Sequence, residues 1–398
     1  MAERIAAPTL DAPDWASIGA VTIGVGAFAL AQGMTYPLIS LTLASRDVSE
    51  AVIGANAAAF AVGLVVSTLA MPQLTRWFSA VQLILGGLFL SAAVLIGLWT
   101  VPVLAAWFVF RFVLGFAVNV IYVVGEAWVN AASPNRLRGR IIAGYIAAMS
   151  VGFIAGPLAV PLFGVENGFG FAACATILGF AAFAFGILSR RARIRPAPSP
   201  PGALLRFFVA APALVLCILA VGFWDASALS VLPVYFLERG LDEARTAMTV
   251  SVFALGVMVS QPLLGLLLDR YEKSLVAMSC VVIAGATFAI MPFLDVQSFL
   301  FWAVLGVNGA AHFGLYTCCV AMLGDRFSGG TLVVGSAAFA LAYAVGAVVG
   351  PPVSGWSMQI NLDFPPWVLA TMAPILVVGY LVLDRDLTRR ERRREGEQ

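Results

Sequence analysis

Long stretches without charged residues dominate this sequence. Runs free of Asp, Glu, Lys and Arg extend over Trp15 to Ser45, Ala51 to Thr75, Trp77 to Phe110, Ile141 to Val165, Asn167 to Ser189, Thr246 to Leu268, Ser274 to Leu294, Val296 to Gly324, Phe327 to Leu362 and Phe364 to Leu383. Several exceed the roughly 20 apolar residues that a helix needs to cross a bilayer core. Only 11% of the residues are charged, against roughly 25% in soluble globular proteins. These features predict an α-helical membrane protein, because a membrane β-barrel would show short alternating segments instead.

Pro, Gly and Asn clusters divide the longest runs into separate spans. The sequence predicts an all-α polytopic membrane protein with 12 transmembrane helices, near residues 17–40, 51–72, 80–100, 103–130, 141–163, 168–189, 207–234, 246–267, 275–293, 298–322, 330–352 and 365–383. Helices of about 20 residues then use nearly all of the apolar content. No large soluble domain is expected.

The basic residues indicate the orientation. Most of the 23 Lys and Arg residues fall in loops on the side of the N-terminus, whereas Arg46, Arg239 and Arg245 fall on the other side. Basic loops stay in the cytoplasm, so both termini are expected there. The N-terminus has no small-residue cleavage pattern, so no removable signal peptide is expected. The net charge of +2 gives no reason to expect a nucleic-acid partner.

An internal repeat divides the chain into halves. Ala59 to Ser67 (AFAVGLVVS) matches Val252 to Ser260 (VFALGVMVS) at a spacing of 193 residues, and GFIAGP matches GAVVGP at 194. The segment RRARIRPAPSPPG between them is too rich in Arg, Pro and Ser to be buried. The predicted organisation starts with a cytoplasmic N-terminus (1–16) and a six-helix bundle (17–189). A cytoplasmic linker (190–205), a second, pseudo-symmetric six-helix bundle (206–384) and a cytoplasmic basic tail (385–398) follow.

Several motifs accompany this repeat. GLLLDRY (Gly265 to Tyr271) resembles a GxxxDRxG loop signature, with Glu272 in place of the final Gly, and its first-half copy keeps only Arg76. Arg111 and Gly115 in RFVLG resemble a fourth-helix Arg pattern. GFIAGP resembles the GxxxGP signature associated with antiporters, although Val160 and Pro161 stand where the full pattern has glycines.

With these motifs, the parallel six-helix repeats resemble the major facilitator superfamily (MFS fold) over nearly the whole chain. A closer likeness is to the drug-resistance-transporter-like branch typified by the bacterial YcaD protein, carried by segments Phe110 to Asn130, Arg138 to Pro157 and Gly314 to Leu323. The resemblance implies a secondary transporter that works by alternating access in the bacterial inner membrane. It also implies that the first, fourth, seventh and tenth helices line a central cavity.

Four ionisable residues fall inside the predicted spans, where a charge costs a few kcal/mol or more and is a candidate functional group. They are Arg111, Glu126, Asp225 and His312. At 1.5 Å per residue, Arg111 lies about 14 Å from the outer helix end near Pro102, and Asp225 about 12 Å from the outer end near residue 233. The two side chains are therefore expected to meet across the cavity. Protonation of Asp225 would then free Arg111 for coupling, or the pair is a permanent salt bridge between the halves.

His312 is expected about 21 Å from the outer end, in the inner half of its helix. It is either a proton carrier, because imidazoles exchange protons near neutral pH, or a hydrogen-bonded residue in a helix interface. Glu126 is expected at the cytoplasmic boundary, paired with Arg76 or Arg140. Together with the loop of Gly265, Asp269 and Arg270, these ion pairs would form an inner latch that holds the cytoplasmic side closed. The alternative is solvated turns with topological charges.

The remaining candidates are polar, aromatic or small residues in the spans. Those on the four central spans are expected to line a mostly apolar cavity or to form ordinary interhelical hydrogen bonds: Gln32, Tyr36, Asn119, Tyr122, Trp224, Asn308 and Tyr316. A second set is expected to permit close helix packing and bends: Gly152, Gly156, Pro157, Gly346, Gly350 and Pro351.

Taken together, these features favour a monomeric transporter whose partners are a small organic solute, protons and the lipid bilayer. Proton-coupled efflux by antiport is the first expectation, and a proton-coupled importer or a uniporter is the alternative. The chain has no Walker A motif, HExxH or GxSxG, and no cofactor or metal is expected. The five Cys residues all fall in apolar spans without CxxC spacing, so neither disulfides nor a zinc site is expected. An intramembrane enzyme or a non-transporting sensor or scaffold is less favoured.

Overall fold

The computed structural model describes residues 12–134, 137–165, 167–191, 207–209, 211–327 and 329–396. Most of the predicted linker (190–205) and of the N-terminal segment (1–16) lies outside these residues. Twelve helices in the described part are long and apolar enough to cross a membrane, which confirms the predicted fold class. The first half contains α1 (Trp15–Ala44), α2 (Glu50–Trp77), α3 (Ala80–Thr100), α4 (Leu104–Ala131), α5 (Arg138–Phe163), α6 (Phe169–Leu188) and the short 3-10 helix η1 (Ser189–Arg191). The second half contains α8 (Pro212–Ser230), α9 (Leu232–Glu238), α10 (Glu243–Arg270), α11 (Lys273–Ile290), η2 (Met291–Phe293), α12 (Phe299–Arg326), α13 (Gly329–Ile360) and α14 (Phe364–Gly396).

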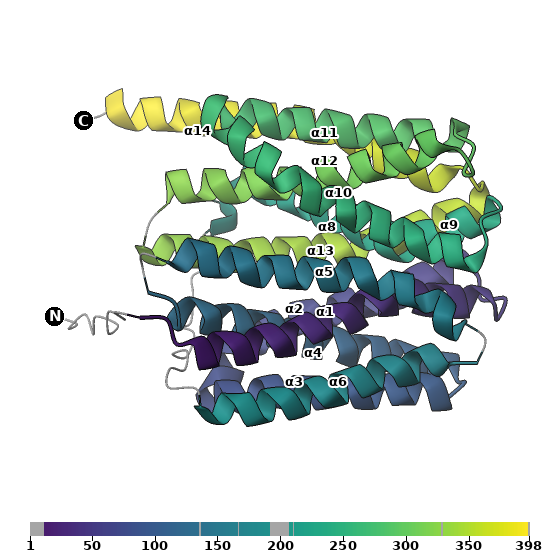
Figure 1. The fold of residues 1–398 in the computed structure, drawn as a ribbon. Coiled ribbons are helices and arrows are strands. Elements are labelled where there is room, and N and C mark those ends of the chain that lie inside the picture. Colours follow the sequence, from purple (N-terminus) through teal and green to yellow (C-terminus); the bar gives the residue numbers. More distant parts are fainter. Residues whose placement is uncertain are drawn as a thin grey trace.

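The helices form two bundles of roughly parallel rods, one above the other in Figure 1. In the first bundle α1 packs on α5 and α6, and α2 packs on α4; in the second, α8 packs on α13 and α14, and α10 packs on α12. The start of α1 and the end of α14 lie at the same end of the molecule, at the left of Figure 1. We call this the terminal end and the opposite one the distal end. The predicted topology puts the terminal end in the cytoplasm.

The two bundles use equivalent glycine contacts at the spacing of the sequence repeat. Gly152 on α5 faces the backbone of Gly26 and Leu30 on α1, whereas Gly346 on α13 faces the backbone of Leu219 and Phe223 on α8. Gly156 and Gly350, one turn further, lie against the same two helices. A side chain at these positions would collide with the neighbouring backbone, so glycine is what allows the helices to approach.

The seventh span differs from the prediction, which ended it near residue 234. The chain continues as α9, because the Tyr235 amide donates to the Val231 carbonyl at 3.1 Å and the Val231 amide to the Ser227 carbonyl at 2.9 Å. Pro233 lies in the first turn of α9, where the missing N–H is not needed. The span therefore reaches Glu238, about one turn beyond the predicted end.

The bundles meet at the distal end. There α2 packs on α13, and α5 packs on α10. Gly54 on α2 faces the backbone of Pro351, which stands beside Pro352 on α13. On the other contact, Ser251 Oγ of α10 donates to the Ile154 carbonyl of α5 at 2.7 Å. The proline at position 351 thus lies in an interface between the bundles rather than inside one of them.

Candidate functional site

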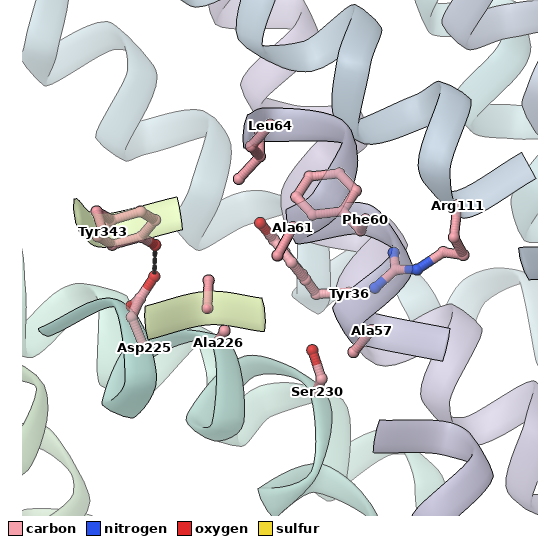
Figure 2. Close-up of a pocket in the computed structure, with 11 residues that line it drawn as sticks. Tyr36, Ala57, Phe60, Ala61, Leu64, Arg111, Asp225, Ala226, Ser230 and Tyr343 are labelled. Atoms are coloured by element: carbon pink, nitrogen blue, oxygen red, sulfur yellow. Dashed lines mark hydrogen bonds between the residues drawn. The ribbon is translucent and has the colours of Figure 1, made fainter. Parts of the chain in front are cut away.

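A small cavity lies between the two bundles, and Figure 2 shows its walls. Its volume is about 20 Å³, which is room for about one water molecule. Helices α1, α2 and α4 supply one side, and α8 and α13 supply the other. The lining residues are Tyr36, Ala57, Phe60, Ala61, Leu64, Arg111, Asp225, Ala226, Ser230, Tyr343 and Ala347.

Asp225 is the acidic group of this cavity, and three helices of the second bundle hold it. Its Oδ1 lies 3.3 Å from Nε2 of His312 on α12, and its Oδ2 accepts a hydrogen bond from the hydroxyl of Tyr343 on α13. The imidazole also stacks on the Phe253 ring, with 4.6 Å between centroids. Asp225 is 8% exposed and His312 is fully buried. Both carboxylate oxygens are therefore bound within the second bundle.

This arrangement corrects the expected position of His312, which was predicted nearer the inner side than Asp225. Because the seventh span continues to Glu238, Asp225 lies about 20 Å from the distal helix end. His312, thirteen residues after Phe299, also lies about 20 Å from the distal end of its helix. The two residues are at the same depth, and the error came from ending the seventh span too early.

Arg111 is at a different depth and does not pair with Asp225. It lies seven residues after Leu104, about 10 Å from the distal end. The expected salt bridge is absent from the ion pairs among the described residues. Instead the guanidinium lies 5.0 Å from the Phe60 ring centroid. Arg111 is 2% exposed, and its Nε and Nη1 have no hydrogen-bond partner among the described residues. Figure 2 shows its guanidinium directed toward Tyr36, apart from Asp225.

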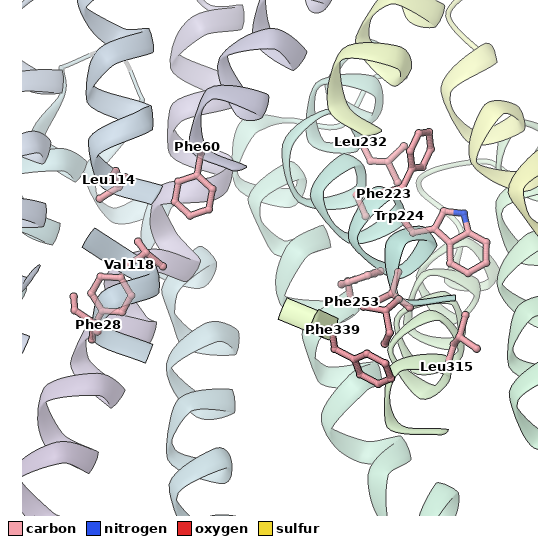
Figure 3. Close-up of a cluster of buried hydrophobic side chains, with 14 of the residues drawn as sticks. Phe28, Phe60, Leu114, Val118, Phe223, Trp224, Leu232, Phe253, Leu315 and Phe339 are labelled. Atoms are coloured by element: carbon pink, nitrogen blue, oxygen red, sulfur yellow. The ribbon is translucent and has the colours of Figure 1, made fainter. Parts of the chain in front are cut away.

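Two residues predicted to line the cavity point elsewhere. Figure 3 shows Trp224 on the side of the second bundle away from Phe28 and Phe60 of the first. Its indole is fully buried and donates to the Leu369 carbonyl on α14 at 2.9 Å. Asn308 donates to Thr287 Oγ1 on α11 at 2.9 Å. Neither residue lines the cavity, and both form interhelical hydrogen bonds inside the second bundle, which is the alternative that the sequence left open.

The other predicted lining residues occupy varied places. Tyr36 lines the cavity, whereas Asn119 donates to Thr68 on α2 at 3.0 Å. The Tyr122 ring packs edge-on against Phe28, and the Tyr316 ring lies near Phe313. Gln32 is buried one turn before Tyr36, and its Nε2 has no partner among the described residues.

Tyr343, which bonds Asp225, was not predicted from the sequence. It lies on the eleventh span, and a single Tyr there belongs to no motif.

The predicted inner latch is not formed in this structure. Its charged members are all exposed, and no ion pair among the described residues joins them to one another: Arg76, Glu126, Arg140, Asp269 and Arg270. A Cβ added at Gly265 would meet no atom within 4 Å. The ion pair that the structure does contain near this end joins Lys273 to Asp325 at 2.5 Å, within the second bundle.

A separate polar cluster closes the distal end of the second bundle. Arg239, just after α9, bonds Asp363 at 2.7 Å and the carbonyl of Pro292 at 2.8 Å. It thereby ties three connections together. Among the described residues, no group of three or more His, Cys, Asp or Glu side chains is arranged to hold a metal ion. No sequence motif predicts this cluster, because its members lie in separate loops.

Closure of the distal end is expected to depend on Gly54. In Gly54→Leu the added side chain collides with the backbone of Pro351. This collision disfavours the conformation in which the two bundles contact each other at the distal end. We expect a cysteine introduced at Ser230, a cavity-lining position, to react at least about tenfold faster with an impermeant maleimide added from the distal side. The five native Cys residues are buried and give a low background. The control is Gly86→Leu, where a Cβ meets no atom within 4 Å; equal labelling of the two variants would contradict this role.

Comparison with known proteins places this geometry in a family. A family model described as Major Facilitator Superfamily matches residues 21–294 and 214–398. A protein of Bacillus subtilis (strain 168) named "Uncharacterized MFS-type transporter YfkF" is 24% identical over 333 residues, covering 82% of this chain and 85% of that protein. The "Uncharacterized MFS-type transporter YcaD" of Escherichia fergusonii is 27% identical over 279 residues, covering 69% of each.

Solved structures show the same fold. The nucleoside transporter NupG superposes with a TM-score of 0.75 at 14% identity, covering 92% of this chain and 98% of that one. A peptide transporter POT in complex with sulfate gives 0.78 at 12% identity, covering 95% of each chain. At such low identity the likeness concerns the fold alone.

Proposed function

Because the chain belongs to the Major Facilitator Superfamily, we propose that this membrane transporter couples the movement of a small organic solute to protons through Asp225. The family consists of transporters rather than enzymes. On this proposal the protein works as a monomer in the bacterial inner membrane, with both termini in the cytoplasm. Arg111 and Asp225 belong to opposite walls of the pathway, and alternating access exposes them to the two sides in turn.

The observation that carries the proposal is the environment of Asp225. A carboxylate at the depth of the bilayer centre is costly and is retained where it serves a function. Here it touches the chain's one histidine at 3.3 Å, and it lines the cavity between the bundles. A proton taken up by this Asp225–His312 pair would alter the charge of the cavity wall. Protonation would then change the relative free energies of the conformations open to the two sides of the membrane, as coupling requires.

The direction of coupling depends on the charge of the solute. A cationic solute would compete with the proton for Asp225, which gives antiport and, under an inward proton gradient, efflux. The GFIAGP motif on α5 favours this possibility. An anionic solute would instead raise the affinity of Asp225 for a proton, which gives symport.

The test uses purified protein in liposomes that contain a pH-sensitive dye. A panel of lipophilic cations, organic acids and neutral metabolites is applied as outward and inward gradients. At least one solute is expected to drive proton movement that protein-free liposomes lack. Transport of a solute with no accompanying proton movement in either direction would contradict the proposal.

Replacement of His312 should weaken the coupling. His312→Gln keeps a hydrogen-bonding side chain beside Asp225 but removes the imidazole, which on this proposal shares the proton with Asp225. We expect the rate of solute-driven proton movement to fall about tenfold or more, measured with the same dye. Asn308→Ala is the matched control, because Asn308 is buried one turn earlier on α12 and bonds α11 instead of Asp225. An equal loss in both variants would indicate a packing role for His312.

A further inference from the structure

The first bundle contains buried hydrogen-bond donors without partners among the described residues, and one of these residues, Arg111, lines the cavity. The Nε and Nη1 atoms of Arg111 lack partners among the described residues, and so do Nε2 of Gln32 and both amide atoms, Nδ2 and Oδ1, of Asn56. All three side chains are at most 2% exposed. A buried donor without a hydrogen-bond partner lowers the stability of the fold, and the free-energy cost is largest for a charged group. The two unpaired donors of Arg111 in the cavity wall fit a ligand that brings acceptor atoms.

Asp225 does not supply those acceptors. Its two oxygens are bound to His312 and Tyr343 within the second bundle. Arg111 lies about 10 Å closer to the distal end than Asp225 does, although both line one cavity. The guanidinium therefore has an aromatic neighbour, Phe60, but no anion among the described residues.

The lining between the two charged residues combines aliphatic side chains with the hydroxyl groups of Tyr36 and Ser230. Ala57, Ala61 and Leu64 line one side, and Ala226 and Ala347 line the other. The present volume of about 20 Å³ admits no organic molecule, so the bundles must separate before a solute enters. When they do, the pathway offers a cation near one end, a middle lined by aliphatic side chains with two hydroxyl groups, and a protonatable carboxylate beyond it.

We propose that Arg111 binds the carboxylate of a monoanionic organic solute whose apolar part lies between Arg111 and Asp225, and that this solute moves together with a proton. The proposal rests on proton coupling at Asp225, as inferred above, and it adds the substrate class and the sign of coupling. It replaces the expected antiport with symport.

Charge balance explains the sign. The charged and titratable groups around Asp225 are His312 on α12, Tyr343 on α13, and Tyr36 and Arg111 across the cavity. With Arg111 charged, Asp225 ionised and the imidazole of His312 neutral, the charges of the empty cavity sum to zero. A bound monoanion alone leaves a net negative charge in a low-dielectric pathway, which is unfavourable. Uptake of a proton restores neutrality, so anion and proton bind cooperatively.

The binding test uses the purified full-length chain in detergent. Its thermal unfolding is followed with a panel of aromatic and aliphatic monocarboxylates, each beside its primary amide and the corresponding amine, and with chloride and inorganic phosphate. At least one carboxylate is expected to raise the Tm by several degrees, whereas its amide, its amine and the inorganic anions have no such effect.

Variants of Arg111 make this test specific. Arg111→Gln is expected to weaken carboxylate binding at least about tenfold, because charged hydrogen bonds are lost, and Arg111→Lys should keep part of the affinity. Since Arg111→Gln removes an uncompensated buried charge, the unliganded variant should fold at least as well as the wild type. Equal carboxylate binding by Arg111→Gln, protection by amines or amides, protection by the inorganic anions alone, or no protection by any carboxylate would each overturn the proposal.

Proton uptake is measured by calorimetry of carboxylate binding in buffers with different heats of ionisation. About one proton is expected to be taken up per carboxylate bound by the wild type and none by Asp225→Asn. Arg111-dependent binding without proton uptake would overturn the symport and also the proton coupling proposed above. Proton movement driven by an amine in liposomes would overturn only the acidic substrate and leave the proton coupling intact.

Discussion

Asp225→Asn is expected to abolish proton-driven solute accumulation. The amide keeps the size of the side chain and its contacts with His312 and Tyr343, but it cannot gain or lose a proton. We expect solute-driven proton movement in liposomes to fall about a hundredfold or more. Exchange of labelled for unlabelled solute should persist, because the amide resembles the protonated carboxyl and exchange needs no proton release.

A surface carboxylate provides the control for that experiment. Asp295→Asn makes the same chemical change at an exposed position between η2 and α12, and it should leave accumulation and exchange unchanged. If Asp225→Asn still accumulated solute against a gradient at the wild-type rate, the carboxylate would have no part in coupling. If exchange also disappeared while the variant remained folded, Asp225 would be needed for the conformational change itself.

Trp224→Ala is expected to have the largest effect on stability. The indole is fully buried, packs 6.1 Å from the Phe288 ring and donates to the Leu369 carbonyl. Truncation leaves a cavity and removes the hydrogen bond to the Leu369 carbonyl, at a cost of about 3–5 kcal/mol. Unfolding of the purified protein in mixed micelles with increasing denaturing detergent would measure the loss.

Two variants separate the contributions to this effect. Trp224→Phe keeps an aromatic ring but loses the hydrogen bond to Leu369, so it should cost about 1 kcal/mol. Trp356→Ala is the control, because Trp356 is 60% exposed on α13 and its truncation opens no internal cavity. If Trp224→Ala altered solute affinity at unchanged stability, the indole would belong to the transport pathway after all.

The fold could be predicted from the sequence because the bilayer restricts which backbone structures can cross it. Backbone polar groups in a bilayer core must be satisfied within the segment, so long uncharged runs become helices. The division into two bundles could also be predicted, because AFAVGLVVS in the first half matches VFALGVMVS in the second half. It also selected Arg111, Asp225 and His312, because an ionisable residue is conspicuous in an apolar span.

The contacts of those residues needed the tertiary structure. In a soluble protein the apolar face of a helix reveals its buried side, but lipid tails and protein interiors are equally apolar, so a transmembrane sequence does not show which face meets the pathway. Trp224 and Asp225 are adjacent in the sequence, yet one packs on α14 and the other lines the cavity.

Depth was the second quantity that the sequence left undetermined. The charge-free runs and the proline at 233 suggested a helix end, whereas the chain stays helical to Glu238 because proline is tolerated in a first turn. That single turn moves Asp225 away from Arg111 and beside His312. The sequence by itself determined the twelve spans, the repeat and the rare buried charges, because the bilayer restricts composition and hydrogen bonding within each segment. Which charges touch was decided by the packing of α8 against α12 and α13, which depends on side chains far apart in the chain.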